Sequence, residues 1–432
     1  MVHAVAPSIG AGNNKDRSAV STMFSKLRST VVLLGSLLGS IGITIFTNHQ
    51  LSQTHLVGFS GINEALLPAG KSRTERLPRI MAIYFPQYHR DPLNDKNWGD
   101  NFTDWVSLKG APKLNRAGFA IPRPTEDLGY YDLTETYPRR RQGELAKEHG
   151  IDGFIYHHYW FYDKTHPGPN LAAPLLNMLN DGHPDLPFFL NWCAAKWVNV
   201  WMGKAIFQTI PTNKNRAITL QDQFFDPPRE EIRKHYQWLS QFFRHKNYIS
   251  IQNQPVMLLY IWDERAAPVL QALRDFAKED GFDGIYWIVG RNAAPDELYV
   301  AKNLTERQEK AMEKKTQQLD MFPLDEVFNQ SMTYPYPLEW ITSTYRVPDW
   351  CRKEGKTREE AAPHTRQEVT GLLTSFDNTP RREFKTATIY GADTPERIME
   401  RFQANLRAAL YYTTCCQQQT DDRFIAINAW NE

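Results

Sequence analysis

The sequence has few cysteines and almost no net charge. Its 432 residues include 4 cysteines, at positions 193, 351, 415 and 416, and no two of them have the Cys-x-x-Cys spacing. Their positions argue against a zinc ribbon or a dithiol redox motif, while a disulfide between Cys351 and either Cys415 or Cys416 stays open. The formal net charge is +1, so nothing in the charge balance points to nucleic acid as a partner.

A second absence lies near the N-terminus, where residues 29–47 carry no charge. The segment is about as long as the roughly 20 residues that span a bilayer. Basic residues, Arg28 among them, precede it, and the next Lys or Arg is Lys71. The positive-inside rule therefore keeps residues 1–28 in the cytosol as a tail and carries the rest across the membrane. We expect a single transmembrane signal anchor at 29–47, followed by a stem at 48–78.

Two alternatives to the anchor are a cleaved signal peptide and a buried helix. The lead before the apolar segment is long for a signal peptide, and Thr47-Asn-His-Gln does not have the small-x-small pattern of a cleavage site. Gly35 and Gly39 have the GxxxG spacing that favours a weak homodimer through the anchor. With the anchor uncleaved, the rest of the chain faces the lumen of the Golgi or endoplasmic reticulum, or the cell exterior.

Aromatic residues, in contrast, are plentiful. They form 12% of the chain, with 12 Trp and 19 Tyr. Their flat rings either fill a large core or stack on the flat C–H faces of sugars, and composition alone favours the core.

From Arg79 onward, short apolar runs alternate with helical patterns. The expected helices include 136–149, 228–245, 266–280 and 395–413. The expected strands are 80–85, 150–156, 186–192, 255–261, 284–290, 321–328, 371–376 and 424–429. Apolar strands separated by helices indicate a parallel sheet covered on both faces, and eight such units predict a (β/α)₈ barrel over 79–432. An open doubly wound sheet is the alternative, but Pro86-Gln-Tyr-His89 stands where a dinucleotide fold would have its glycine-rich turn.

Polar and aromatic side chains follow nearly every expected strand. In a (β/α)₈ barrel the chemistry gathers at these strand ends, and donors framed by aromatic rings suit hydroxyl-rich ligands. No regular carboxylate spacing accompanies the histidines, so no metal or cofactor is expected. Each of these residues also has a purely structural alternative. The histidines can bind loop carbonyls, the tryptophans can pack in the core, and Asp377-Asn378 can form an Asx turn. We predict Glu432 as a catalytic carboxylate and substrate contacts by Tyr84, Gln87, His89, His158, Tyr159, Trp160, Trp192, Tyr260, Asp377, Asn378, Asn428, Trp430 and Asn431.

Six motifs then appear in one order along the chain. They are Ala82-Ile-Tyr-Phe-Pro-Gln-Tyr-His89; Trp98-Gly with Phe102-Thr-Asp-Trp105; Leu128-Gly-Tyr-Tyr-Asp132; Gly150-Ile-Asp-Gly-Phe154 with His158-Tyr-Trp-Phe161; Asp377-Asn-Thr-Pro-Arg-Arg382; and Ile427-Asn-Ala-Trp-Asn-Glu432. With them the chain resembles the WbsX-type glycosyltransferase family, which is similar to glycoside hydrolase family 99, the endo-α-mannosidase group. The resemblance implies a (β/α)₈ barrel acting on glycans, and it adds Trp98 and Asp104 to the expected substrate contacts.

The resemblance also implies a mechanism. In the hydrolase relatives a first glutamate acts on the sugar 2-hydroxyl, which attacks the anomeric carbon, and a second glutamate protonates the leaving oxygen. The family's terminal motif is Asn-Glu-Trp-x-Glu-Gly. This chain matches it at Asn431 and Glu432, where the sequence stops, so we expect a chain truncated within its site.

A second departure follows the third strand. The family usually has Trp-Ala-Asn-Glu-x-Trp there, whereas this chain has Trp192-Cys-Ala-Ala-Lys-Trp197. Asp104 likewise stands where the family more often has Glu. The loss of a carboxylate at Ala194-Ala195 favours either a shift toward an anionic sugar or a loss of activity. The primary hypothesis is therefore a membrane-anchored glycosidase or glycosyltransferase acting on polysaccharide or N-glycan-type chains. The alternatives are a glycan-binding pseudoenzyme of the same fold and a structural membrane protein.

Overall fold

The computed structural model describes residues 77–198, 219–260, 263–291, 326–329, 368–382, 384, 387, 389–390, 393–416 and 423–431. They all belong to one compact unit, residues 67–432, whereas the other unit, residues 1–66, lies outside the described part. The predicted tail, anchor and stem therefore fall outside it, apart from the last two stem residues. Within the described ranges, no helix is both long and apolar enough to span a bilayer.

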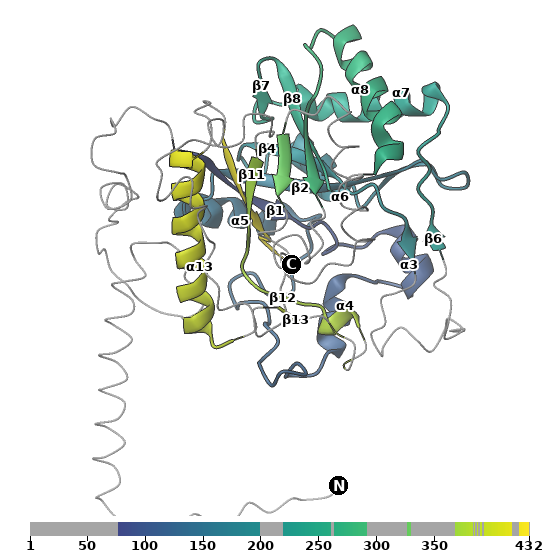
Figure 1. Ribbon diagram of the computed structural model, residues 1–432. Helices are drawn as coiled ribbons and strands as arrows, with labels where there is room; N and C mark the ends of the chain where they lie inside the picture. The colour runs from purple at the N-terminus through teal and green to yellow at the C-terminus, as the bar shows by residue number, and fades with distance from the viewer. Residues whose placement is uncertain are drawn as a thin grey trace, which may run out of the picture. The chain divides into compact units, whose positions relative to one another are not determined.

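The centre of the fold is a closed ring of parallel strands (Figure 1). Each strand pairs in parallel with the next, and the last pairs with the first, so the ring has no free edge. Closure excludes the open doubly wound sheet, and the predicted succession of eight strands is confirmed. The strands are β1 (Arg79–Tyr84), β2 (Gly153–Phe161), β4 (Phe188–Trp192), β8 (Gln254–Leu259), β9 (Tyr286–Arg291), β10 (Glu326–Asn329), β11 (Glu368–Leu373) and β14 (Phe424–Asn428).

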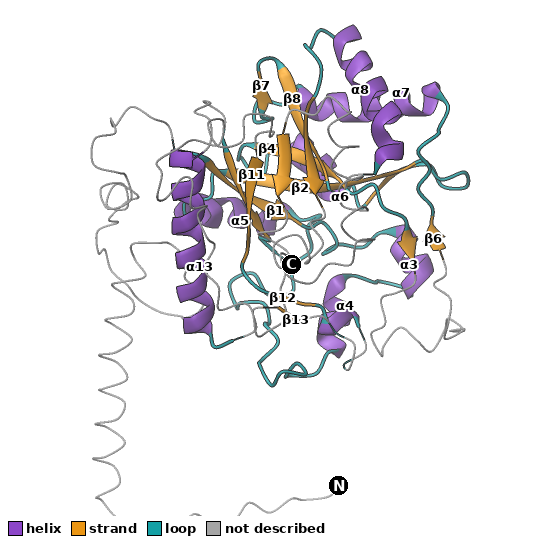
Figure 2. Cartoon of the chain, viewed as in Figure 1, coloured by secondary structure: helices purple, strands orange, loops and turns teal. Residues whose placement is uncertain are grey.

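Helices surround the strands (Figure 2). Four of them match the expected helices to within two residues at either end: α5 (Thr136–Glu148), α7 (Arg229–Phe243), α8 (Ala267–Glu279) and α13 (Pro395–Tyr411). Short helices α3 (Pro92–Trp98), α4 (Asp104–Gly110) and α6 (Ala173–Asp181) were not predicted. The first two lie in the long connection after β1, and Pro92 near the start of α3 and Asp91 as its N-cap fit the usual preferences of a helix start.

The remaining elements are short strands and single helical turns. Strands β3 (Gly168–Asn170) and β7 (Ser250–Ile251) add antiparallel to β2 and β8. Two further antiparallel pairs stand apart from the ring: β5 (Trp197–Val198) with β6 (Thr219–Gln221), and β12 (Phe376–Asp377) with β13 (Ile389–Tyr390). Single turns η1 (Glu264–Ala266) and η4 (Thr379–Arg381) are 3₁₀ helices, and a π-helical turn, Tyr412–Cys416, follows α13.

The strand registers decide which side chains face the inside of the barrel. Successive side chains of a strand point to opposite faces, and residues paired in parallel point to the same face. The rings of Phe189 on β4 and Phe424 on β14 meet across the barrel with centroids 5.6 Å apart, which fixes both as inward. His157 and Asn191 pair in register and have the inward parity of Phe189. Their neighbours His158 and Trp192 therefore point outward, toward the helices.

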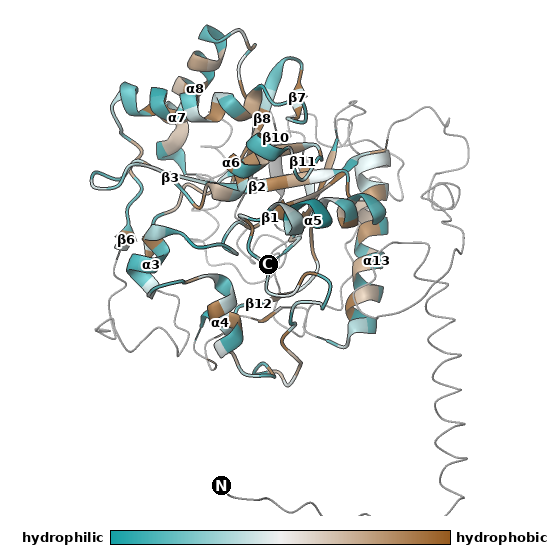
Figure 3. Ribbon diagram, turned by 180° about the vertical axis from the view of Figure 1, so that it is seen from behind, coloured by the Kyte–Doolittle hydropathy of each residue, from teal (hydrophilic) through white to brown (hydrophobic). Residues whose placement is uncertain are grey.

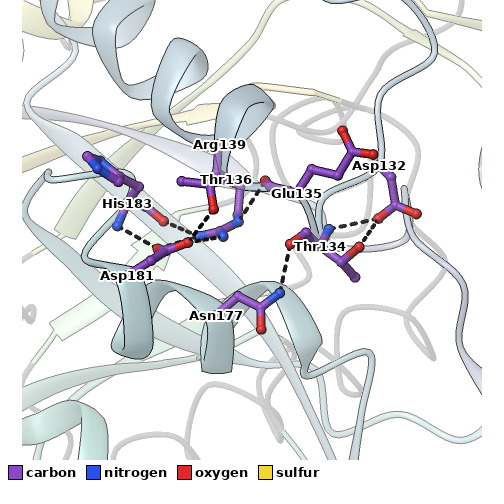
Figure 4. A network of polar contacts seen from close by, with 8 residues as sticks. All are labelled: Asp132, Thr134, Glu135, Thr136, Arg139, Asn177, Asp181 and His183. Atoms are coloured by element: carbon purple, nitrogen blue, oxygen red, sulfur yellow. Dashed lines mark hydrogen bonds and ion pairs between the residues drawn. The ribbon is translucent and has the colours of Figure 1, made fainter.

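Helix α5 packs on the barrel through a polar face. Most of its surface is hydrophilic (teal in Figure 3), yet it buries Arg139 and Gln142. Figure 4 shows the network around Arg139. Its guanidinium binds the Asp181 carboxylate through two nitrogens, with one contact of 2.9 Å, and also donates to the carbonyls of His183 and Glu135. These bonds tie α5 to the end of α6.

The charge state of Asp181 follows from this network. Burial opposes its ionisation, but hydrogen bonds from Arg139, His183 N–H and Thr136 outweigh burial and lower the pKa of Asp181 to about 2. Asp181 is consequently ionised at neutral pH, and in Figure 4 its carboxylate also accepts from the Thr136 hydroxyl and the His183 N–H.

We predict that Arg139→Ala lowers the free energy of unfolding by about 3 kcal/mol, because it leaves a partly buried carboxylate and two carbonyls without their donor. Urea denaturation at pH 7 measures the change. Arg140→Ala is the matched control: Arg140 is 51% exposed and has a 3.8 Å contact with Glu144 on the same helix, so its removal costs less than about 0.5 kcal/mol. Equal effects of the two substitutions would contradict the assignment.

Candidate active site at the rim of the barrel

Phe85, the residue after β1, is the centre of the rim. Its backbone N–H donates to Oδ1 of Asn431 and its carbonyl accepts from Nδ2 of the same side chain, each over 2.8 Å. The Tyr131 hydroxyl also hydrogen-bonds to Asn431. We call the paired bonds between Asn431 and Phe85 the amide clamp. The clamp holds the residue that precedes Glu432 against the tip of the first strand.

Three side chains lie against the Phe85 ring. The His157 ring meets it edge-to-face with centroids 6.0 Å apart, and Tyr88 does so at 6.1 Å. The Arg381 guanidinium lies 4.8 Å from the ring centroid. Nε of Arg381 also donates to Oδ1 of Asp104 over 2.8 Å, and both side chains are largely buried. A cation, a carboxylate and an aromatic face therefore meet at one point.

An aromatic cluster extends from this point toward the surface. Tyr88 packs on Trp105 at 4.2 Å, and Trp105 contacts Tyr130 at 5.3 Å and Tyr131 at 4.9 Å. The indole N–H of Trp105 donates to the Tyr131 carbonyl over 2.7 Å, which fixes its orientation. Tyr130 is 46% exposed. This sequence of rings, buried at one end and exposed at the other, suits stacking on a hydroxyl-rich chain.

A second group of polar side chains lies inside the barrel next to Phe85. Nδ1 of His157 is 3.0 Å from Nδ2 of Asn191 and 2.8 Å from Sγ of Cys193. The Tyr260 ring meets the His157 ring edge-to-face at 5.3 Å. All come from the carboxyl ends of β2, β4 and β8, as a barrel rim requires. Of the predicted contacts, Tyr260 thus lies in this group, and Tyr159 borders it with its ring 6.3 Å from His157.

The loop after β11 reaches the rim through η4. Asp377 accepts from Asn115 over 2.9 Å and from the Thr379 N–H over 2.8 Å. The second bond forms the Asx turn, the structural alternative to a sugar contact, and Asn378 is the N-cap residue of η4, without a side-chain capping bond. Asp104, by contrast, is brought directly to the rim by Arg381 from the same turn. Asp377 therefore orders the segment that delivers Arg381.

Four predicted contacts point away from the rim, and the structure corrects them. Tyr84 is buried and donates to Gln142 of α5. His158 is stacked on Trp238, Trp160 is stacked on His235, and the indole of Trp192 donates to the Trp160 carbonyl. All four have outward parity, so helices rather than a sugar cover them. A fifth, Trp98, packs with Phe102, Val106 and Leu220 in a separate hydrophobic cluster.

The remaining predicted residues lie near β1 and β14. Gln87 and His89 are buried, and Nδ1 of His89 is 2.6 Å from the Pro86 carbonyl. The Trp430 ring packs on the outward Phe154 at 5.3 Å, and the Asn428 carbonyl accepts from Thr374. Asn431 uses its amide for the clamp, so it positions the rim rather than binding sugar through those atoms. Glu432 lies outside the described residues.

Several rim residues were missed: Phe85, Trp105, Tyr131, His157 and Arg381. Each belongs to or adjoins a motif quoted above, yet we took only part of each motif into the site. Inward and outward parity would have separated His157 from His158, and the choice between them depends on strand register. Among the described residues, no group of three His, Cys, Asp or Glu side chains is arranged to hold a metal ion.

A buried pair of histidines lies between the outward face of β2 and helix α7. Nε2 of His158 is 2.9 Å from Nε2 of His235, and Nδ1 of His235 is 2.9 Å from the Tyr162 hydroxyl. One of the two Nε2 atoms must donate and the other accept, so the rings cannot both be protonated. Burial lowers the pKa of His158 to about 3, and burial together with the neighbouring His158 lowers the pKa of His235. Both rings are neutral in the folded protein.

We predict that this pair makes the fold sensitive to acid. The unfolded chain binds a proton on each ring below about pH 6.5, whereas the folded chain does not. Stability is thus fully present above pH 6.5 and falls by up to about 2.7 kcal/mol per pH unit on the acid side. His158→Phe should halve that slope in urea melts between pH 6.5 and 5. An undiminished slope in His158→Phe would refute the assignment.

The sequence matches the family model of the glycosyltransferase WbsX over residues 80–432. Two relatives from Xanthomonas campestris pv. campestris are both called uncharacterized protein WxcX. The one from strain B100 is 27% identical over 380 residues, covering 86% of this chain and 49% of the relative. The one from strain ATCC 33913 is 27% identical over 364 residues, covering 83% and 46%. The chain spans about half the length of these curated relatives, and the resemblance inferred from the six motifs is confirmed.

Solved structures show a distant likeness of fold. The GH99 endo-α-mannosidase from Bacteroides thetaiotaomicron aligns with a TM-score of 0.43 and 10% identity, covering 82% of this chain and 85% of that chain. Its complex with bis-tris-propane gives 0.41 and 9%, covering 82% and 84%. A glycoside hydrolase-like protein gives 0.43 and 12%, covering 86% and 89%.

Proposed function

We propose a function from one premise: the chain belongs to the glycosyltransferase WbsX family. It is a glycan-active enzyme that makes or breaks a glycosidic bond at the rim around Phe85. The observation that carries this proposal is the amide clamp, because it ties the segment ending in Glu432 to the point where Arg381, Asp104 and the aromatic cluster meet.

Each part of the rim has a role in this proposal. The rings of Trp105 and Tyr130 stack on the sugar chain, and Tyr130 is exposed enough to receive it. The Arg381–Asp104 pair supplies hydrogen-bonding groups for sugar hydroxyls. Glu432 accepts the proton of the sugar hydroxyl that attacks the anomeric carbon, while the bond from that carbon to the leaving oxygen breaks. Glycosidic chemistry generally requires a second group that protonates the leaving oxygen.

We predict that Glu432→Gln lowers kcat by about 10²- to 10⁴-fold, the usual contribution of a positioned acid or base. Turnover is followed by mass spectrometry with a panel of labelled glycans, α-mannosides among them, with and without nucleotide-sugar donors. Glu144→Gln is the matched control, since Glu144 lies on the exposed face of α5, 50% exposed. Unchanged turnover in Glu432→Gln would remove Glu432 from the mechanism.

A glycan-binding protein without turnover is the second candidate. Its support is the sequence after β4, where Ala194 is half-buried and Ala195 and Lys196 are exposed at the rim. Two small side chains there leave the sugar without the carboxylate that the family usually supplies. Saturable binding of a glycan by calorimetry, with no product in any assay and no effect of Glu432→Gln on affinity, would favour this candidate over the enzyme.

Membrane anchoring through residues 29–47 is part of the proposal. It rests on the uncharged apolar sequence VVLLGSLLGSIGITIF at 31–46 and on the basic residues before it. We expect the full chain to float with membranes and to resist alkaline carbonate, and a chain lacking residues 29–47 to be released. Release of the full chain by carbonate would exclude an integral anchor.

A further inference from the structure

Cys193 lies at the rim in contact with an imidazole. It directly follows β4, and its Sγ is 2.8 Å from Nδ1 of His157 on the neighbouring strand β2. Both residues are largely buried, at 7% and 6% exposure. A structural cysteine normally packs among apolar groups, where its thiol stays protonated and inert. Here a polar partner, Nδ1 of His157, lies within reach and can accept the thiol proton.

Asn191 is an independent second observation at the same place. It is fully buried, with the inward parity of His157. Its Nδ2 is 3.0 Å from Nδ1 of His157, so the amide and the thiol approach the same nitrogen. The other end of this amide, Oδ1, is buried and has no hydrogen-bond partner among the described residues. A buried acceptor without a donor costs about 1–3 kcal/mol, so this oxygen favours a donor that the described residues do not supply.

The hydrogen-bond pattern sets the proton positions. Nδ2 of Asn191 can only donate, so Nδ1 of His157 is the acceptor and the ring proton resides on Nε2. The amide and the thiol share the single lone pair of Nδ1. Transfer of the thiol proton to Nδ1 gives a thiolate next to an imidazolium, the arrangement that activates cysteine nucleophiles. The edge-to-face contacts of Phe85 and Tyr260 hold the His157 ring in place for this transfer.

We propose that Cys193 is a reactive thiol activated by His157, and that it is a site of covalent modification by peroxides and soft carbon electrophiles. With hydrogen peroxide, the thiolate sulfur forms a bond to one oxygen and the O–O bond breaks. The departing hydroxide takes the proton from His157 and leaves as water. The sulfur is oxidised to sulfenic acid and the peroxide is reduced. The thiol lies at the same rim, because His157 also contacts Phe85, but its reaction requires no glycan.

The test is site-resolved alkylation of the intact, folded full chain. Trace iodoacetamide is applied between pH 6 and 9, and the rate at each of the four cysteines is read by peptide mass spectrometry. In the reaction, sulfur forms a bond to the methylene carbon and iodide leaves. At pH 6.5 we expect the alkylation rate of Cys193 in the unmodified chain to be at least about 10-fold higher than in the His157→Gln variant. As the pH is raised, the rate in the unmodified chain should reach its plateau before pH 8. An ordinary thiol instead gains tenfold per pH unit up to about 8.5.

Two further measurements keep the proposal decisive if His157→Gln folds poorly. The pH profile of the unmodified chain needs no variant, and dimedone trapping after peroxide should label Cys193 and be lost in Cys193→Ser. Circular dichroism checks that each variant is folded. Cys193 that reacts only after denaturation, or with the pH profile of a free thiol, or that yields no dimedone adduct, would overturn the assignment.

Discussion

The rim depends on the bond pair by which Asn431 holds the backbone of Phe85. The two residues stand at opposite ends of the barrel sequence, and the strands that precede them, β1 and β14, are the pair that closes the ring. An amide side chain that both donates to and accepts from the backbone of one residue imitates another step of the ladder beyond the last strand. It therefore fixes the direction in which the chain leaves β14. The Tyr131 hydroxyl bonds to the same Asn431 side chain, and His157 and Arg381 lie against the ring of the Phe85 that it holds.

The architecture could be predicted because its signals were local. Continuous apolar runs such as Phe424–Asn428 and amphipathic helices such as α7 are encoded within a few turns of sequence. The site was harder, because it depends on the face to which each side chain points. His157 and His158 are adjacent and chemically identical, yet one faces the barrel interior and the other faces α7. Only the register with β4, a long-range feature, separates them.

The tryptophans show the same limit of prediction from sequence. Trp105 and Trp98 belong to one motif, but Trp98 fills a small hydrophobic cluster and Trp105 joins the ring sequence at the rim. Composition favoured the core for each tryptophan taken singly, and for Trp98, Trp160 and Trp192 this was correct. A site built on aromatic rings cannot be separated from a core built on them until the connections between strands are placed. In this chain Trp98 lies on α3 and Trp105 lies on α4, both in the connection after β1. The placement of these two helices separates the core tryptophan from the rim tryptophan.

Closure of the ring by its first and last strands also bears on how the protein is made. Phe85 and Asn431 are 346 positions apart. At about 5–20 residues per second, the ribosome needs on the order of tens of seconds to produce the partner of β1 after β1 has emerged. During that interval one edge of the nascent sheet has no neighbour. An unpaired apolar edge is a template for aggregation, so biosynthesis of this barrel should call on chaperones that shield nascent chains until translation reaches the last strand.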